Sequence, residues 1–284
     1  MNDIGGNQIN NYIGNSPLDS NGCPILWLNG PAGSGKSAIS QTIAEHYAAQ
    51  QKIAASFFFF RGAGQHSQIE HLIPTLAYQV SIFNQAAKSV LIDSMREEPN
   101  LHKQALYHQL DRLLIKPIQA TGLELSKILI IINALDECDD KELISQFIAA
   151  IFTICNVQLP FKLFLTSCFN QLIKKSVVKY LSLQSINATA DIQLYLKSEL
   201  SSLYERKFRI MQNIPGPWPS EEHLDRLSRN AAGSFIIAST LVKFIDKEKG
   251  HPNDNLQEAL NMTDGLDPVY HQVITTAFQE NRTL

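Results

Sequence analysis

The sequence predicts an α/β fold in which a mainly parallel sheet forms the middle of three layers, followed by a small all-helical domain. Two observations lead to this prediction. A glycine-rich loop, Gly30–Ser37, lies between a short apolar run and a stretch of helical periodicity. Further along, short apolar runs continue to alternate with amphipathic stretches, which is the pattern of right-handed βαβ units.

The glycine-rich loop reads GPAGSGKS and has the G-x-x-x-x-G-K-S spacing of a phosphate loop. Its glycines let successive N–H groups turn toward a phosphate, and the following helix adds partial positive charge there. We expect Lys36 to reach the β- and γ-phosphates and Ser37 to ligate Mg²⁺. The candidate nucleotide-binding residues are Gly30, Pro31, Ala32, Gly33, Ser34, Gly35, Lys36 and Ser37. A plain glycine turn is the alternative, but the Lys-Ser pair and both flanks favour a P-loop NTPase fold.

An aromatic run, Ala54–Phe60, follows the first strand and helix and is expected to be a strand buried on both faces. Arg61 comes directly after it. Its guanidinium is a candidate contact for a γ-phosphate, whereas a solvated turn residue is the simpler interpretation.

The next helices are predicted from capping and periodicity. Ser67 and Glu70 have the spacing of a capping box before a helix of about residues 69–83, and Pro74 is expected to kink or restart that helix. Residues 88–126 are predicted to form one or two amphipathic helices whose apolar stripes belong to the core.

The second informative stretch reads KILIIINALDE, residues 127–137. Its five consecutive apolar residues predict a buried parallel strand, whose carboxyl end faces ligands in an open α/β sheet. A Walker B strand normally ends in an aspartate that holds the Mg²⁺ shell, and here that position is Asn133. We expect the amide to accept a hydrogen bond from a metal-bound water. Because an amide carries no negative charge, the affinity of the site for Mg²⁺ should be about 10- to 100-fold lower than with an aspartate. Ser37 and Asn133 are the candidate metal residues.

Two acids, Asp136 and Glu137, follow this strand and are the candidate catalytic residues. One of them is placed to orient or deprotonate an attacking water. Adjacent acids after a strand are also common as a polar turn or a helix cap, and both interpretations stay open.

The remaining pattern gives the domain organisation. A helix of about residues 141–155 and a strand at Phe161–Cys168 complete the sheet domain. Helices then follow, with Asp191 as the expected N-cap of a helix over residues 192–204 and another helix over residues 221–230 after a proline-rich linker. The expected organisation is a flexible tail at 1–22, a P-loop NTPase domain at 23–189 and a helical domain at 190–284 that continues the module and is truncated.

Composition describes a globular protein and excludes several classes. The chain has 284 residues, of which 44% are hydrophobic and 18% charged, and its formal net charge is −3. This balance gives no general attraction to nucleic acid. No secretory signal or membrane span is recognisable, and the four cysteines are expected to be buried, reduced thiols of a cytoplasmic protein.

Several stretches together resemble the NACHT domain of fungal NOD-like receptors, which are STAND-type P-loop ATPases with nephrocystin-like N-terminal domains. The resemblance covers about residues 22–280. The stretches that carry it are ILWLNGPAGSGKSAISQTIAEHYA, SFFFFRG, HLIPTLAYQV, ILIIINALDEC, KLFLTS, Asp191–Leu196, Trp218–Leu227, Ala231–Ile236 and Leu266–Tyr270.

The resemblance implies a nucleotide-operated switch. ADP would hold such a protein closed, and exchange for ATP would let it open and self-associate through the NTPase module, with ATP or ADP and Mg²⁺ as cofactors and protein partners that the sequence does not name. The family usually has a γ-phosphate-sensing arginine where this chain has Cys168. Together with Asn133, this departure predicts weak or lost hydrolysis. The alternatives are a pseudo-NTPase scaffold and a P-loop kinase or hydrolase, with no nucleic-acid or membrane partner in any of them.

Overall fold

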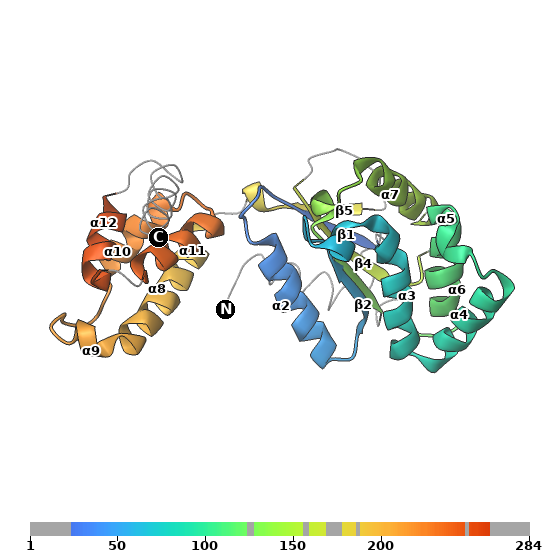
Figure 1. Ribbon diagram of the computed structural model, residues 1–284, viewed down its shortest axis with the longest axis horizontal. Coiled ribbons are helices and arrows are strands. Elements are labelled where there is room, and N and C mark those ends of the chain that lie inside the picture. The colour runs from blue at the N-terminus through green and yellow to red at the C-terminus, as the bar shows by residue number, and fades with distance from the viewer. Residues whose placement is uncertain are drawn as a thin grey trace, which may run out of the picture. The chain divides into compact units, whose positions relative to one another are not determined.

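The computed structural model describes residues 24–123, 128–155, 159–168, 178–185, 188–247 and 250–261. The described residues up to Pro31 form one compact unit with Lys36–Leu183, and Ala32–Gly35 group with the residues from Gln184 onward in a second unit. Figure 1 labels the elements of both. The expected tail at 1–22, Cys23 and the stretch Leu266–Tyr270 lie outside the described residues.

The first unit is built on a five-stranded parallel sheet with the order β2-β3-β4-β1-β5. The strands are β1 (Ile25–Asn29), β2 (Ile53–Phe58), β3 (Leu129–Asn133), β4 (Lys162–Ser167) and β5 (Val178–Ser182). Because all pairs are parallel, the carboxyl ends of the strands meet at one edge. β4 lies between β1 and β3, so the polar end of β4 separates the strand before the phosphate loop from the strand that ends in Asn133.

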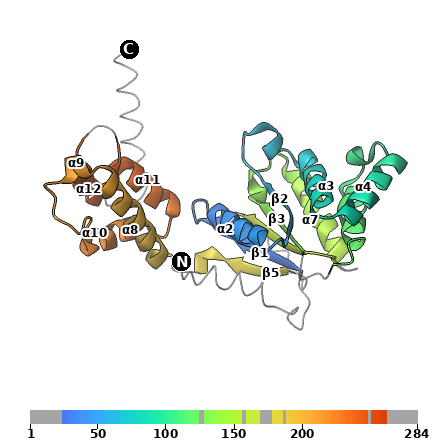
Figure 2. The same cartoon turned by 90° about the horizontal axis from the view of Figure 1, so that it is seen from below.

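Helices cover both faces of the sheet, as the alternation of side chains along β1 shows. Ile25 and Trp27 belong to the large core cluster that includes residues of α3 (Leu72–Phe83), α4 (Gln85–Glu97) and α7 (Lys141–Cys155). Leu26 and Leu28 point to the other face, where they pack with Ile43 and Tyr47 of α2 (Lys36–Ala49). Figures 1 and 2 show α2 on one side of the sheet and α3, α4 and α7 on the other. The predicted three-layer α/β fold is confirmed.

The predicted capping box before α3 is wrong. The Ser67 hydroxyl donates to the Gly64 carbonyl at 2.9 Å and contacts the Asp139 carboxylate at 2.5 Å, and a 3-10 turn at Ile69–His71 precedes the helix. The helix begins at Leu72, so Pro74 lies in its first turn. N–H groups there have no intrahelical partner, and a proline is tolerated without a kink.

The region after α4 is more broken than the predicted amphipathic helices. α5 (Leu106–Leu110) continues into a π-helical turn, Asp111–Ile115, and then into α6 (Lys116–Gln119). The Lys116 amide donates to the Asp111 carbonyl, five residues back. Pro117 has no N–H to donate and its ring crowds the carbonyl four residues earlier, which explains a widened turn at this position.

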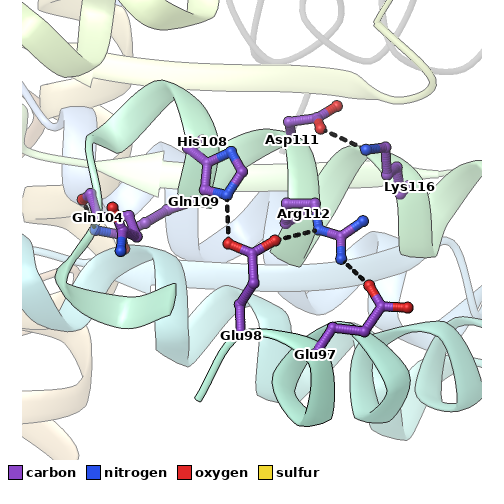
Figure 3. Close-up of polar contacts among 8 residues, drawn as sticks. All are labelled: Glu97, Glu98, Gln104, His108, Gln109, Asp111, Arg112 and Lys116. Carbon is purple, nitrogen blue, oxygen red and sulfur yellow. Dashed lines mark hydrogen bonds and ion pairs between the residues drawn. The ribbon is translucent and has the colours of Figure 1, made fainter. Parts of the chain in front are cut away.

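An ion-pair cluster connects the end of α4 to the π-helical turn, as Figure 3 shows. The Glu98 carboxylate lies 2.7 Å from His108 Nε2 and 3.3 Å from Arg112 Nε, and Glu97 pairs with the same guanidinium. The hydrogen bond with His108, helped by the charge of Arg112, lowers the pKa of Glu98. The cluster therefore depends on a charged carboxylate at this position.

The described part of the second unit after residue 184 is helical. Its helices are α8 (Thr189–Arg206), α9 (Phe208–Met211), α10 (Glu221–Asn230), α11 (Phe235–Ile245) and α12 (Pro252–Leu260). Their apolar faces share a core that includes Leu196, Leu227, Leu241 and Leu256. The predicted all-helical continuation is confirmed, but α8 begins at Thr189, so Asp191 lies in its first turn and is not the N-cap.

Candidate functional site

The glycine-rich loop connects β1 to α2, and two of its glycines have backbone angles that favour glycine. Gly33 and Gly35 have φ values of +76° and +89°, which L side chains rarely adopt. Within the second unit, the amides of Phe235 and Ile236 donate to the Gly33 carbonyl at 2.9 and 3.3 Å. A Cβ on Gly33 would lie 2.6 Å from Ile236 Cγ2. Glycine is therefore required at Gly33 by conformation and by space.

Lys36 is a buried cation at the start of α2, with only 7% of its surface exposed. Its ammonium donates to the carbonyls of Gly30 and Pro31, both at 2.8 Å, and to the Cys168 sulfur at 3.1 Å. The Cys168 sulfur is partly desolvated, which raises the pKa of its thiol, so all three partners are uncharged at neutral pH. These partners hold the ammonium in place without cancelling its charge, and an anion at the loop would benefit from it.

Asn133 ends β3 and is 2% exposed. Its amide oxygen lies 2.7 Å from Thr166 Oγ1 and 2.9 Å from Ser40 Oγ. Its amide nitrogen donates to Ser37 Oγ at 3.1 Å. A single side chain at the end of β3 thus connects the end of β4 with two hydroxyls on the first turns of α2.

The direction of these hydrogen bonds follows from Thr166. The backbone N–H of Ala134 donates to Thr166 Oγ1 at 2.8 Å, so this hydroxyl is already an acceptor. Its one hydrogen is then available for the Asn133 oxygen. The Asn133 oxygen therefore faces Thr166 and Ser40, and the NH₂ group faces Ser37. Ala134 itself has a φ of 58°, an unusual conformation for a residue with a Cβ, directly after the strand.

The residues present fit Mg²⁺ poorly. The Asn133 oxygen already faces two hydroxyls, and its nitrogen, which carries only hydrogens, points to Ser37. In this geometry the amide presents no acceptor toward Ser37, and the contact of Asn133 with a metal-bound water remains a prediction. Within the described ranges, no group of three or more His, Cys, Asp or Glu side chains is arranged to hold a metal ion. The role of Ser37 as a metal ligand remains a prediction.

The two candidate catalytic acids lie in the 3-10 turn Leu135–Glu137 at the same edge of the sheet. Asp136 Oδ1 accepts a hydrogen bond from the Cys168 amide at 2.8 Å. Glu137 Oε2 accepts one from the Arg61 amide at 3.2 Å. Each carboxylate thus fixes a neighbouring strand end, which is what the polar-turn interpretation requires. Their catalytic roles remain predictions.

Two further side chains at this edge correct or add to the predicted site. The Arg61 guanidinium donates to the Asp136 carbonyl at 3.3 Å and so lies at the same strand ends. Cys168 is exposed as a residue, although its sulfur is partly desolvated, and it contacts the candidate phosphate-binding lysine, so the expectation of a buried thiol is wrong for it. Cys138 is buried as expected.

Sequence reasoning did not select Ser40 and Thr166, although both side chains are completely buried in the network. A signal for Ser40 was present, because it follows Lys36 by four residues and shares its helix face. Thr166 belongs to the polar end of β4, but its partner could be identified only once the order of the strands was known.

Comparison with solved structures shows that the fold of this chain also occurs in other proteins. A structure of PCH-2 from C. elegans superposes with a TM-score of 0.53 at 14% sequence identity, covering 94% of this chain and 68% of PCH-2. A structure of Drosophila ORC bound to DNA gives a TM-score of 0.48 at 11% identity, covering 96% of this chain and 66% of the ORC chain. At this identity the PCH-2 match shows shared architecture only, and the looser ORC superposition adds nothing to it.

The family of this chain is identified by comparing its sequence with those of known families. A search of curated proteins finds no significant match. The family model described as nephrocystin 3, N-terminal matches residues 14–168. That range covers more than half of the chain and includes the phosphate loop, Asn133 and Cys168. The nephrocystin-like resemblance is therefore confirmed, and the chain belongs to the nephrocystin 3, N-terminal family.

Proposed function

We propose that this chain is an ATP/ADP-binding regulatory switch module of an intracellular NOD-like receptor, with weak or lost ATP hydrolysis. The observation that carries the proposal is the buried Lys36 ammonium, which three uncharged groups hold at the phosphate loop. Binding of a polyphosphate would exchange one or more of these uncharged acceptors for a phosphate oxygen, so that both partners of the hydrogen bond are charged. Each such bond contributes about 1.5–3 kcal/mol.

Weak hydrolysis follows from what surrounds the proposed γ-phosphate position. The family's sensor arginine is replaced by Cys168, whose thiol stays neutral because its sulfur is partly desolvated, so this position supplies no positive charge to a developing transition state. The Asp136 carboxylate is engaged by the Cys168 amide. Glu137 likewise has one oxygen engaged by the Arg61 amide, so each acid keeps a second oxygen to act on water and both are candidate bases.

A pseudo-NTPase scaffold is the second candidate. It is favoured by the same hydrogen bonds, which give both acids a structural role without any chemistry. Steady-state phosphate release distinguishes the two candidates. Release that Glu137→Gln reduces at least tenfold supports the hydrolytic switch, whereas native release equal to that of the Glu137→Gln variant supports the scaffold.

The module organisation is part of the proposal. Residues 23–189 would be the NTPase domain and residues 190–284 its helical continuation, with self-association through the NTPase domain when ATP replaces ADP. None of the helices in the described ranges is both long and apolar enough to cross a bilayer. Neither a membrane nor a nucleic acid is among the proposed partners.

Calorimetric titration of the full chain with ADP tests the proposal. We expect saturable binding with a stoichiometry of about one nucleotide per chain. Circular dichroism of the same sample shows that the protein is folded. A folded chain that takes up no ADP or ATP at millimolar concentration, with or without Mg²⁺, would refute the function.

A further inference from the structure

We propose that this nucleotide site operates without a divalent cation, because Asn133 turns the Ser37 hydroxyl into a direct hydrogen-bond donor to a phosphate oxygen. The inference rests on the proposed function, since it concerns how the phosphate loop holds a nucleoside diphosphate. It deepens that function by defining the ligand as metal-free nucleotide.

The first step is that the side chain behind Ser37 is a hydrogen-bond donor and not an acceptor. A serine that ligates a metal directs its oxygen lone pairs to the ion and its hydrogen to an acceptor behind it. Here the group behind Ser37 is the Asn133 nitrogen, a donor at 3.1 Å. The hydroxyl hydrogen of Ser37 must therefore find its acceptor elsewhere. Ser37 is exposed in the first turn of α2, where a bound phosphate would provide that acceptor.

The second step is that the Asn133 amide is locked in this orientation. In the flipped orientation, the NH₂ group would face Thr166 Oγ1, which already accepts from the Ala134 amide. The Thr166 hydrogen would then lose its acceptor inside a side chain that is completely buried. Buried polar groups avoid this state, so Asn133 continues to present a donor to Ser37.

The third step is charge. An aspartate at the end of β3 would bring a negative charge that favours a cation beside Ser37, and the amide of Asn133 brings none. The buried Lys36 ammonium, with uncharged partners, already supplies positive charge at the loop. A divalent cation would therefore enter a positive site that has no compensating carboxylate at position 133, and it would add little to nucleotide affinity.

The test compares ADP titrations of the full chain in EDTA and in excess Mg²⁺. For the native chain we expect dissociation constants that agree within about threefold in the two buffers. In Asn133→Asp, Mg²⁺ should strengthen ADP binding at least tenfold, which is the scale of an outer-shell carboxylate. Ser37→Ala should weaken binding about tenfold even in EDTA, because it removes a donor to a charged oxygen. Ser145→Ala, an exposed serine on α7, serves as the matched control and should bind as the native chain does.

Each outcome decides something. Native binding that Mg²⁺ strengthens tenfold or more, or Ser37→Ala binding that is unchanged in EDTA, would overturn this inference and leave the proposed function intact. Absence of ADP binding in both buffers would refute the proposed function and this inference with it. Should Asn133→Asp fail to fold, the native and Ser37→Ala titrations in the two buffers still decide the question.

Discussion

Replacement of Thr166 by valine should destabilise the first unit, because Thr166 connects two groups that have no contact with water. The side chain is completely buried, and valine has nearly the same shape. The variant removes the acceptor of the Ala134 N–H, 2.8 Å away, and the donor to the Asn133 oxygen, 2.7 Å away. An unmet buried N–H costs about 1–3 kcal/mol and a lost neutral hydrogen bond about 0.5–1.5 kcal/mol. We therefore expect the free energy of unfolding to fall by about 2–4 kcal/mol.

Urea unfolding followed by tryptophan fluorescence measures this change. The chain has two tryptophans, one in each unit, and Trp27 donates to Ser167 Oγ at 2.9 Å beside the altered residue. A Trp218→Phe background isolates that probe. Thr153→Val on α7, whose exposed hydroxyl donates to the Ala149 carbonyl, is the control and should change stability by less than about 0.5 kcal/mol. A Thr166→Val variant within about 0.5 kcal/mol of its parent, at unchanged m-value, would refute the network as described.

Three further predictions concern stability. Asn84→Ala should cost about 1 kcal/mol in urea unfolding, because the Asn84 side chain accepts hydrogen bonds from two amides at the start of α4. Glu98→Gln should lower the thermal midpoint of unfolding at pH 7. The difference in midpoint between the variant and the native chain should become smaller as the pH falls below 4.5, the ordinary pKa of the carboxyl group. A carboxylate whose pKa is lowered in the folded state contributes stability only while it is charged. Gly33→Ala should destabilise the second unit more than Gly233→Ala, as measured by Trp218 fluorescence during unfolding. Both glycines have a similar positive φ, but of the two only Gly33 has no space for a Cβ. Equal effects of the two glycine variants, or a pH-independent effect of Glu98→Gln, would contradict the respective contacts.

Elements with strong local signals could be predicted from the sequence. The phosphate loop was found because its spacing and both flanks agree. β3 was found because the run Ile128–Ile132 has five consecutive apolar residues, all of them buried in the sheet. The predicted range of α7, residues 141–155, matches the observed helix because its apolar stripe extends over these residues.

Elements that depend on distant contacts could not be predicted. β5 is an edge strand that pairs only with β1 among the described strands, and its exposed second and third residues hide the pattern of a strand. The Ser67 hydroxyl was expected to cap a helix, but Asp139, 72 residues further along the chain, contacts it instead. The π-helical turn at Asp111–Ile115 interrupts a region whose apolar periodicity continues without a break.

The same limit applies to the candidate site. The sequence identified Lys36, Ser37 and Asn133, because these residues have fixed places in a phosphate-loop pattern. It did not show which way the Asn133 amide faces, since that depends on Thr166 from a strand inserted between β1 and β3. The orientation of the Asn133 amide thus changes the role that the phosphate-loop pattern predicts for this residue.

The most direct test of the account is the affinity of the full chain for ADP before and after Lys36→Ala. Loss of one charge-assisted hydrogen bond, at about 1.5–3 kcal/mol, predicts an affinity at least tenfold lower. Lys88→Ala, an exposed lysine on α4, is the matched control and should leave the affinity unchanged. If the Lys36→Ala variant binds ADP as tightly as the native chain, the buried ammonium does not hold a phosphate and the account is contradicted.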